Sequence, residues 1–240
     1  MSELLRLSDV HTHIGRYHIL HGVDFDVIEG RTTMLLGRNG AGKTTTLRTV
    51  MGLWPPSSGE ITLAGQRIDA RATPDIARAG VGYVPESMAV FSDLTVKENL
   101  ILAARDGPLD DTRLEWIFGF FPALKRFWLS RAGSLSGGQK QMLSIARAVV
   151  EPRKLLLIDE PTKGLAPAII VALIECFAEL KRRGATILLV EQNFRVAQEI
   201  GDTVNVMDNG RVVHAGTMAE LARDETLQHR LLGLSLDTHQ

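Results

Sequence analysis

Residues 37–44 constrain the fold of this 240-residue chain more than any other feature, because they match the phosphate-binding pattern G-x-x-x-x-G-K-[ST] at every fixed position. A short apolar strand is predicted just before them, at 32–36, and a helical pattern starts at Thr44. A loop between a strand end and a helix N-terminus presents free backbone N–H groups and the positive end of the helix dipole to an anion. The predicted nucleotide-binding residues are Gly37, Arg38, Asn39, Gly40, Ala41, Gly42, Lys43, Thr44 and Thr45.

The residue types in this loop define its expected chemistry. Glycine lets the backbone bend around phosphate oxygens without a Cβ in the way. Lys43 is expected to reach the β- and γ-phosphates of ATP, and the Thr44 hydroxyl is expected to hold Mg²⁺. A chance match is the alternative, but only about one random chain in a hundred of this length would contain the pattern. The loop therefore predicts ATP and Mg²⁺ as cofactors.

An acidic pair follows another apolar strand. Residues 155–158 are all leucine or isoleucine, and Asp159 and Glu160 come directly after them. Ligands of open α/β sheets bind at the carboxyl ends of the strands, so both carboxylates are expected beside the phosphate loop. We predict that Asp159 holds Mg²⁺ through water and that Glu160 orients or deprotonates the attacking water. A solvated acidic loop is the alternative, which the fully apolar strand makes a poor one.

Strands and helical patterns alternate along most of the chain, which predicts a mainly parallel sheet covered by helices. The segment 91–134 differs, because it has few β-branched runs and is expected to be helical. Asp208-Asn209-Gly210-Arg211 predicts a hairpin turn, since Asn-Gly favours type I′. Further short strands are predicted at 60–63, 81–84, 186–190 and 204–207.

Composition excludes several classes of protein. The formal net charge is −1, so the whole chain has no nucleic-acid footprint. The single cysteine, Cys176, allows no intramolecular disulfide, which suits a reducing cytoplasm, and its apolar surroundings predict a buried side chain. The N-terminal residues lack the pattern of a signal peptide, and the longest apolar runs have the length of strands rather than of membrane spans.

A second glycine-containing motif precedes a helical stretch at 140–150. A hydroxyl and glycines at a helix N-terminus predict another anion site. One chain rarely needs two such sites for one phosphate tail, so we expect this one to contact nucleotide bound to another subunit. The motif consists of Leu135, Ser136, Gly137, Gly138 and Gln139.

This ordered pair of motifs resembles the ATP-binding-cassette (ABC) ATPases, whose signature peptide is the sequence at 135–139, and the resemblance covers essentially the whole chain. It implies an α/β fold with a P-loop (RecA-like) core, an antiparallel β subdomain and an inserted helical subdomain. We expect one domain over 1–240, with the helical subdomain at about 91–134 and the remainder, about 1–90 and 135–240, forming the core and β subdomain. The resemblance also implies a head-to-tail dimer, in which each ATP contacts Lys43 of one chain and the signature peptide of its neighbour.

Two residues depart from the family pattern near the expected γ-phosphate. Glu86 stands where the family has a glutamine, and a carboxylate there would bind Mg²⁺ but repel phosphate in the absence of metal. Nucleotide affinity is then expected to depend unusually on Mg²⁺; a loop carboxylate without metal contact is the equal alternative. Gln192 stands where the family has a histidine, and its amide donates hydrogen bonds but does not titrate near neutrality. The predicted catalytic set is Glu160, Gln192 and Lys43, and the predicted metal set is Thr44, Asp159 and Glu86.

Two further departures concern the adenine and the loop after the acidic pair. The family's adenine-stacking aromatic is expected just before Gly15, where this chain has Ile14, and Tyr17 is the candidate replacement. Ala166 stands where many members have an aspartate, so communication between the two ATP sites is expected to differ.

Aromatic residues gather at 116–128, and Trp116 and Phe120 share a helical face at i, i+4. Part of this cluster is therefore expected to be subdomain core. The basic and aromatic sequel at 124–131 has the composition of a partner surface. In the resembled family, a short helix of a membrane permease docks on the helical subdomain and the adjoining loop, which corresponds here to about 86–95.

Several stretches look like the second ATPase of bacterial branched-chain amino-acid importers. This similarity implies an ATP-hydrolysing importer subunit on the cytoplasmic face of the inner membrane, attached peripherally. The implied partners are a second ABC ATPase subunit (a paralogue or the same chain), two membrane permeases and a periplasmic binding protein. Importers of urea or short amides are the near alternative, and a soluble ABC protein without a transporter is the distant one. The similar stretches are 81–86, 164–167, 188–193 and 231–234.

Overall fold

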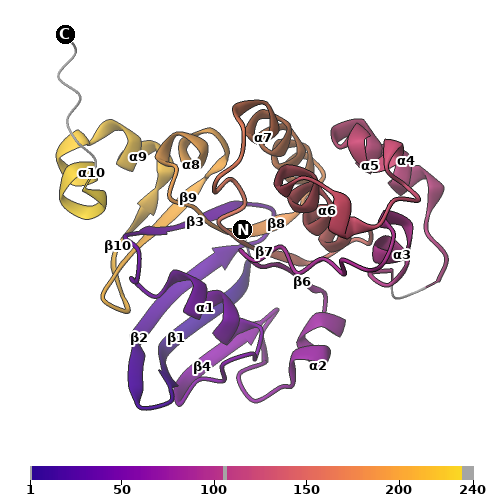
Figure 1. Ribbon diagram of the computed structural model, residues 1–240. Coiled ribbons are helices and arrows are strands. Elements are labelled where there is room, and N and C mark those ends of the chain that lie inside the picture. The colour runs from indigo at the N-terminus through magenta and orange to yellow at the C-terminus, as the bar shows by residue number, and fades with distance from the viewer. Residues whose placement is uncertain (1, 105–106, 234–240) are drawn as a thin grey trace, which may run out of the picture.

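The computed structural model describes residues 2–104 and 107–233, so Leu234 of the stretch 231–234 lies outside the described residues. A six-stranded sheet crosses the centre of the molecule (Figure 1), with strand order β10-β9-β3-β8-β7-β6. All its neighbouring strands pair in parallel except β9 and β10, which are antiparallel. Its strands are β3 (Thr32–Gly37), β6 (Val81–Val84), β7 (Leu155–Asp159), β8 (Thr186–Val190), β9 (Thr203–Asp208) and β10 (Arg211–Thr217).

A smaller antiparallel sheet, with strand order β2-β1-β4-β5, lies below the first in Figure 1. Its inward face is apolar, and Val23, Phe25 and Val27 are buried on it. The alternation of buried and exposed residues in β2 is the pattern of a sheet with one covered face. The strands are β1 (Glu3–Ile14), β2 (Tyr17–Ile28), β4 (Ser58–Leu63) and β5 (Gln66–Arg67).

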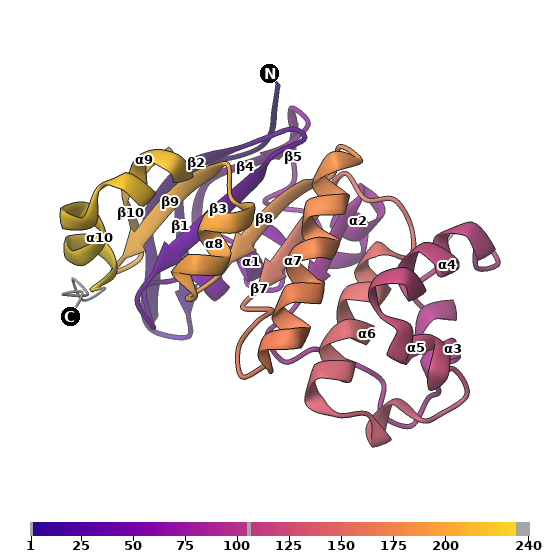
Figure 2. The ribbon, with the colours of Figure 1, turned by 90° about the horizontal axis from the view of Figure 1, so that it is seen from above.

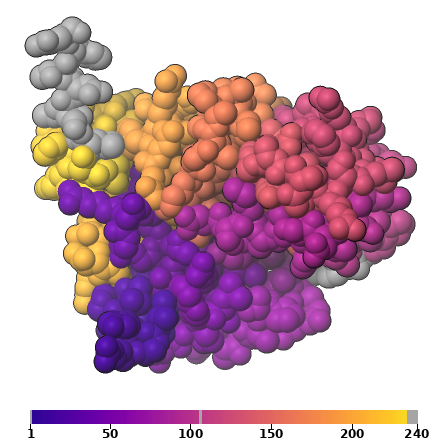
Figure 3. All heavy atoms as spheres, in the orientation of Figure 1, coloured from indigo at the N-terminus to yellow at the C-terminus, as the bar shows by residue number. Residues whose placement is uncertain are grey.

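Helices surround the six-stranded sheet. Seen from above, α3, α4 and α5 lie at the end of the molecule opposite to α9 and α10 (Figure 2). On the face shown in Figure 3, the N-terminal strands form the lower edge and the helical segments drawn in magenta to red form the right side. The helices are α1 (Lys43–Val50), α2 (Thr73–Arg78), α3 (Val96–Ile101), α4 (Asp111–Phe120), α5 (Pro122–Arg126), the 3₁₀ turn η1 (Ala132–Ser134), α6 (Gly137–Val149), α7 (Pro167–Arg182), α8 (Phe194–Ile200), α9 (Met218–Arg223) and α10 (Glu225–Leu232).

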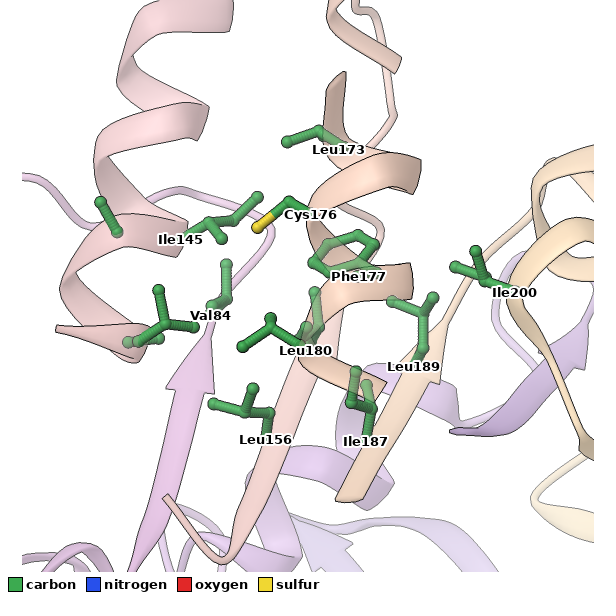
Figure 4. Close-up of a cluster of buried hydrophobic side chains, with 14 of the residues drawn as sticks. Val84, Ile145, Leu156, Leu173, Cys176, Phe177, Leu180, Ile187, Leu189 and Ile200 are labelled. Atoms are coloured by element: carbon green, nitrogen blue, oxygen red, sulfur yellow. The ribbon is translucent and has the colours of Figure 1, made fainter. Parts of the chain in front are cut away.

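Both faces of the central sheet are buried, which explains why its middle strands are continuous apolar runs. On β7, Leu156 and Ile158 belong to the core under α6 and α7, whereas Leu155 and Leu157 belong to the core that contains α1 and the smaller sheet. Figure 4 shows Phe177 of α7 among the side chains of the first core. The parallel strands all end at the same edge, so the loops that follow them converge.

The expected features of the helical segment are present. The predicted stretch 91–134 contains α3, α4, α5 and η1, and the rings of Trp116 and Phe120 meet edge to face at 5.4 Å. Phe121 is fully buried, while Leu129 is 75% exposed. The subdomain boundaries stay a prediction.

Two smaller expectations are confirmed. Asn209 and Gly210 have φ of 45° and 72°, as a type I′ turn requires, and they connect β9 to β10. Cys176 is buried, and its burial raises the pKa of the thiol to about 12. Among the described residues, none of the helices has the length and hydropathy that a membrane span needs.

Candidate nucleotide site

Four loops meet at the carboxyl edge of the central sheet. The phosphate loop follows β3. Glu86 lies just after β6, Asp159 is the last residue of β7, and Gln192 lies just after β8. The register aligns these ends, since Asp159 lies beside Val190 and Val84 lies beside Ile158. Residues that are far apart in sequence therefore share one edge, as the strand pattern predicted.

The phosphate loop has the backbone that its glycines permit. Gly37 and Gly42 have φ of 143° and 107°, and a Cβ on Gly37 would lie 2.3 Å from the carbonyl oxygen of Met207. Only glycine fits this close approach to β9. The Lys43 ammonium donates hydrogen bonds to the carbonyl oxygens of Gly37, at 2.8 Å, and Arg38, at 3.0 Å. The lysine thus points back into the loop from the start of α1.

Lys43 is 4% exposed, and its burial lowers the pKa of the ammonium, although Glu160 and Asp159 oppose this shift. In the same loop, Arg38, Asn39 and Gly40 are exposed. The residues that follow, Ala41 and Thr45, are buried against the core. A phosphate group on this loop would therefore meet exposed backbone on one side and a buried cation on the other.

Thr44 and Asp159 form a pair suited to a divalent cation. The Thr44 hydroxyl donates to Oδ1 of Asp159 at 3.1 Å. The other carboxylate oxygen, Oδ2, is buried and has no hydrogen-bond partner among the described residues. Burial raises the pKa of Asp159 to about 6, against the hydrogen bond from Thr44. A buried carboxylate oxygen without a partner and an adjacent hydroxyl are oxygen ligands of the kind that Mg²⁺ prefers, so these two residues fit the metal.

Glu160 is held in an uncommon conformation by its neighbours. Its φ is 46°, in the left-handed region that few non-glycine residues adopt. Its Oε1 accepts a hydrogen bond from the Gln192 amide at 2.6 Å. Its Oε2 is buried, accepts no hydrogen bond from the residues that the structure describes, and lies 3.4 Å from Lys163 Nζ. The strained backbone and the amide together aim this carboxylate, which is the arrangement expected of a functional residue.

Glu191 is a site residue that the sequence analysis did not single out. It is 2% exposed, and its Oε1 accepts hydrogen bonds from the hydroxyl and backbone N–H of Thr162 at 2.6 and 3.2 Å. Its Oε2 accepts from the backbone N–H groups of Gln192 and Asn193. Burial raises the pKa of Glu191, against these hydrogen bonds. The carboxylate connects the loop after β7 to the loop after β8. The available signal was a charged residue directly after the apolar run 187–190.

The phosphate loop and Gln192 face a common hollow. A small cavity of about 130 Å³ is lined by residues of the phosphate loop, of the β8–α8 connection and of α10. It includes Arg38, Glu191, Gln192 and Leu232. Gln192 therefore lies beside the phosphate loop, and its role toward the γ-phosphate stays a prediction.

Glu86 has a partner that the sequence did not indicate. Its Oε1 accepts a hydrogen bond from Lys163 Nζ at 2.6 Å. Glu86 is the residue that immediately follows Pro85, at the end of β6, and its side chain is 40% exposed. The carboxylate thus stands at the strand edge as expected, with a lysine beside it.

The signature peptide caps a helix in this structure. Ser136 is the N-cap of α6, and its hydroxyl accepts a hydrogen bond from the backbone N–H of Gln139 at 3.3 Å, while the Gln139 side chain accepts one from the Ser136 backbone N–H. Ser136 and Gly137 are exposed, and Gly138 is packed against Ile169 of α7. No hydrogen bond of the described residues joins this peptide to the phosphate loop of its own chain.

Tyr17 lies at the tip of the β1–β2 hairpin, opposite Ile14, and is 61% exposed. Its ring has Arg16 above it, at 5.4 Å from the ring centroid. An exposed aromatic ring at this tip is available for stacking, and no hydrogen bond or ring contact of the described residues joins Tyr17 to the phosphate loop.

A larger groove lies beside this site. It has a volume of about 640 Å³ and is lined by Arg48, Trp54, Met88 and Arg147 among others. Ser144 and Arg147 of α6 donate hydrogen bonds to the carbonyl oxygens of Met88 and Ala89, at 2.6 and 2.5 Å. The groove therefore lies between the phosphate-binding core, the loop after Glu86 and α6, and Ala103 of the helical segment also lines it.

The fold and this site together define a P-loop nucleoside triphosphatase. The sequence profile described as ABC transporter matches residues 20–163. The chain belongs to the ABC transporter family, as an ATP-binding subunit with ATPase activity.

Two curated relatives match over nearly their full length. The chain is 39% identical over 232 residues to "High-affinity branched-chain amino acid transport ATP-binding protein BraG" of Pseudomonas aeruginosa, covering 96% of this chain and 100% of the relative. It is 35% identical to "Probable branched-chain amino acid transport ATP-binding protein LivF" of Archaeoglobus fulgidus, covering 96% and 99%. A solved structure described as "Structure of ATP binding subunit of ABC transporter" has a TM-score of 0.81 and 35% identity, covering 98% of this chain and 96% of that one. The resemblance inferred from the motifs and the fold class are confirmed.

Proposed function

We propose that this chain is the ATP-hydrolysing subunit of an importer for branched-chain amino acids. The similarity to BraG and LivF over almost the whole of each chain supports the choice of transporter. Importers of urea or short amides are the alternative, because no residue of an ATPase subunit is expected to contact the transported substrate. The observation that carries the ATPase assignment is the meeting of Lys43, Asp159 and Glu160 at one sheet edge. Within residues 2–104 and 107–233, two oxygens of these carboxylates have no hydrogen-bond partner.

The residues are proposed to act as follows. The loop residues 37–45 bind the phosphates through backbone N–H groups and Lys43, and Tyr17 stacks on adenine. Thr44 and Asp159 would hold Mg²⁺, with Glu86 as a further candidate ligand. When bound, Mg²⁺ would neutralise charge on the β- and γ-phosphates.

Glu160 is proposed to orient or deprotonate the attacking water. The Gln192 amide donates to Oε1 of Glu160 at 2.6 Å, and Oε2 has Lys163 Nζ at 3.4 Å but no hydrogen bond in the described part of the chain. Oε2 is therefore the oxygen proposed to accept a proton or a hydrogen bond from that water. Gln192 cannot titrate near neutrality, so proton handling falls to Glu160. Gln192 positions the carboxylate and donates to the γ-phosphate.

Glu160→Gln tests this assignment. The amide keeps the size of the side chain but cannot accept a proton, so turnover should fall by about 10²–10⁴-fold while ATP binding survives. Turnover is measured by phosphate release and binding by titration with a fluorescent ATP analogue. Robust hydrolysis by this variant would refute the role of Glu160; Glu199→Gln, on the exposed side of α8, is the matched control that should hydrolyse ATP normally.

Two chains are proposed to enclose two ATP molecules head to tail, with Ser136 and Gly138 of each facing the ATP of the other. Two observations support this arrangement. Ser136 is exposed, and no hydrogen bond of the described residues joins it to the phosphate loop of the same chain. The partner is a paralogous ATPase or a second copy. With ATP, the Glu160→Gln variant should then run as a dimer with itself or with the paralogue in light scattering, and a Gly137→Arg change should abolish that dimer.

The groove beside Glu86 is proposed to receive a short helix of one membrane permease, and the second ATPase subunit would receive the helix of the other permease. Its mixed lining of apolar and arginine side chains supports this role, since interface cores are enriched in aromatic, methionine and arginine residues. Two permeases and, through them, a periplasmic binding protein complete the proposed importer. The proposed location is accordingly the cytoplasmic face of the inner membrane, held there by the permeases.

A further inference from the structure

Lys163 is the feature of this site that the proposed ATPase mechanism leaves unexplained. Its ammonium donates to Oε1 of Glu86 at 2.6 Å and lies 3.4 Å from Oε2 of Glu160. Lys163 belongs to the loop after β7, whereas Glu86 follows β6, so one cation joins the ends of two neighbouring strands. Both carboxylates belong to the set predicted to handle metal and water.

The loop that carries Lys163 is anchored on both sides. The Lys163 backbone N–H donates to the carbonyl oxygen of Glu160 at 3.3 Å, which closes a turn and brings the two side chains together. The preceding residue, Thr162, is bonded twice to the buried carboxylate of Glu191. The lysine side chain is 58% exposed along its length, but its tip is held between two carboxylates. The position of the Lys163 ammonium group is therefore determined by its two carboxylate partners in the site, although much of the side chain is exposed to solvent.

Charge explains what this lysine contributes. Three carboxylates, Glu86, Asp159 and Glu160, gather around the place where phosphates would bind, and the ammonium groups of Lys43 and Lys163 face them. The charges act on one another, because Glu160 and Glu86 both contribute to the raised pKa of Asp159. Without Lys163, the carboxylate of Glu86 would stand uncompensated beside an entering polyphosphate and would oppose its binding.

We infer that Lys163 is a positioning residue, which serves as the counter-cation of Glu86 and Glu160 when the site holds no metal and thereby lets nucleotide bind without Mg²⁺. This inference rests on the proposed ATP site. It also revises the expectation that Glu86 by itself makes nucleotide affinity unusually dependent on Mg²⁺. The pair of Glu86 and Lys163, not the carboxylate alone, sets that dependence.

Nucleotide binding with and without metal tests the inference. A fluorescent ATP analogue is titrated into the full chain in EDTA and again in excess Mg²⁺. Lys163→Met should weaken binding about five- to tenfold in EDTA, because the charge of Glu86 is then exposed at a partly solvated site. In Mg²⁺ the same variant should stay within about twofold of the wild type.

Two further variants make the test specific. The double variant Glu86→Gln with Lys163→Met should recover the binding in EDTA, because it removes both charges. Lys125→Met is the matched control: Lys125 forms a similar ion pair with Glu115 at 2.9 Å, its side chain is 60% exposed, and both residues lie in the helical segment. This control should change binding under neither condition, and all variants should melt close to the wild-type temperature.

Three results would overturn the inference: equal weakening in EDTA and in Mg²⁺, unchanged binding of Lys163→Met in EDTA, or no recovery in the double variant. These results differ from a failure of the proposed function. Hydrolysis by Glu160→Gln would remove the catalytic assignment and leave the ratio of affinities for Lys163→Met intact. A wild-type chain that binds no nucleotide under either condition would remove both.

Discussion

At the scale of single residues, the site concentrates carboxylates that the fold does not satisfy. Asp159 is fully buried, has one oxygen without a hydrogen bond in the described part of the chain, and has a pKa raised to about 6. The folded state therefore holds a proton on this group more tightly than the unfolded chain does. Its ionisation lowers the free energy of unfolding as the pH rises from about 4 to about 6, and the loss stays constant above that range.

Asp159→Asn should consequently stabilise the nucleotide-free protein. The amide removes the buried charge and can still accept the hydrogen bond from Thr44. At pH 8 the gain should be about 1–3 kcal/mol, from a shift of about two pKa units at 1.36 kcal/mol each. Urea unfolding at pH 8 and pH 4 checks this, since the gain should nearly vanish at pH 4. An equal gain at both pH values would contradict the electrostatic explanation. In a separate measurement, Mg²⁺ and ATP should no longer stabilise the Asp159→Asn variant against unfolding.

At the scale of elements, the phosphate loop is shaped by a neighbour that is distant in sequence. The carbonyl oxygen of Met207, on β9, leaves no space for a side chain on Gly37, and the turn at Gly210 donates a backbone hydrogen bond to Ala41 at 2.9 Å. The sequence pattern correctly predicted both the loop and the hairpin turn. It did not show that they touch, because that contact depends on β9 lying next to β3 in the sheet.

Gly37→Ala should therefore lower the free energy of unfolding by more than the addition of one methyl group usually does. The new methyl group would force β3 and β9 apart and would hold alanine at a φ of 143°. We expect a loss of about 2–4 kcal/mol in the free energy of unfolding, together with a loss of ATP binding. Gly137→Ala is the matched control, because its Cβ would meet no atom within 4 Å and its backbone is helical. Similar losses from the two changes, measured by urea unfolding, would argue against the role of Met207.

At the scale of the whole molecule, the groove of about 640 Å³ lies between the core, the loop after β6 and α6. A partner in this groove would touch the loop that carries Glu86 and also α6, which starts at the signature peptide. The proposed permease helix would therefore contact two elements that end at the nucleotide site and at the signature peptide.

Leu53→Glu tests that connection. Leu53 lines the groove and is 47% exposed, so a carboxylate there should leave the ATPase activity of the isolated subunit unchanged and should abolish co-purification with membrane partners. The measurement is affinity purification of the tagged chain from gently solubilised membranes. Two permeases and a second ATPase should co-purify with the wild type. The affinities of the companion binding protein for leucine and for urea can then be compared.

The control for this experiment is Val213→Glu, which changes a valine of β10 that is 48% exposed and lies outside the groove. It should retain the membrane partners. Equal recovery of permeases by both variants would remove the groove as the docking site. Recovery of soluble partners alone by the wild type would contradict the importer proposal.

The sequence by itself determined the parallel strands of the central sheet, the phosphate loop, the acidic pair and the family. Each depends on residues adjacent in the chain: glycine spacing, apolar runs and the residues that end them. The tertiary structure alone decided the side-chain partners between strand ends. Thr44 with Asp159, Glu160 with Gln192, Thr162 with Glu191 and Glu86 with Lys163 are such pairs. Parallel strands bring residues as far as 115 positions apart to a common edge, and which charge faces which depends on strand order and loop conformation. Neither is encoded by a local pattern, so Lys163 was only one residue of a loop until the fold placed it between two carboxylates.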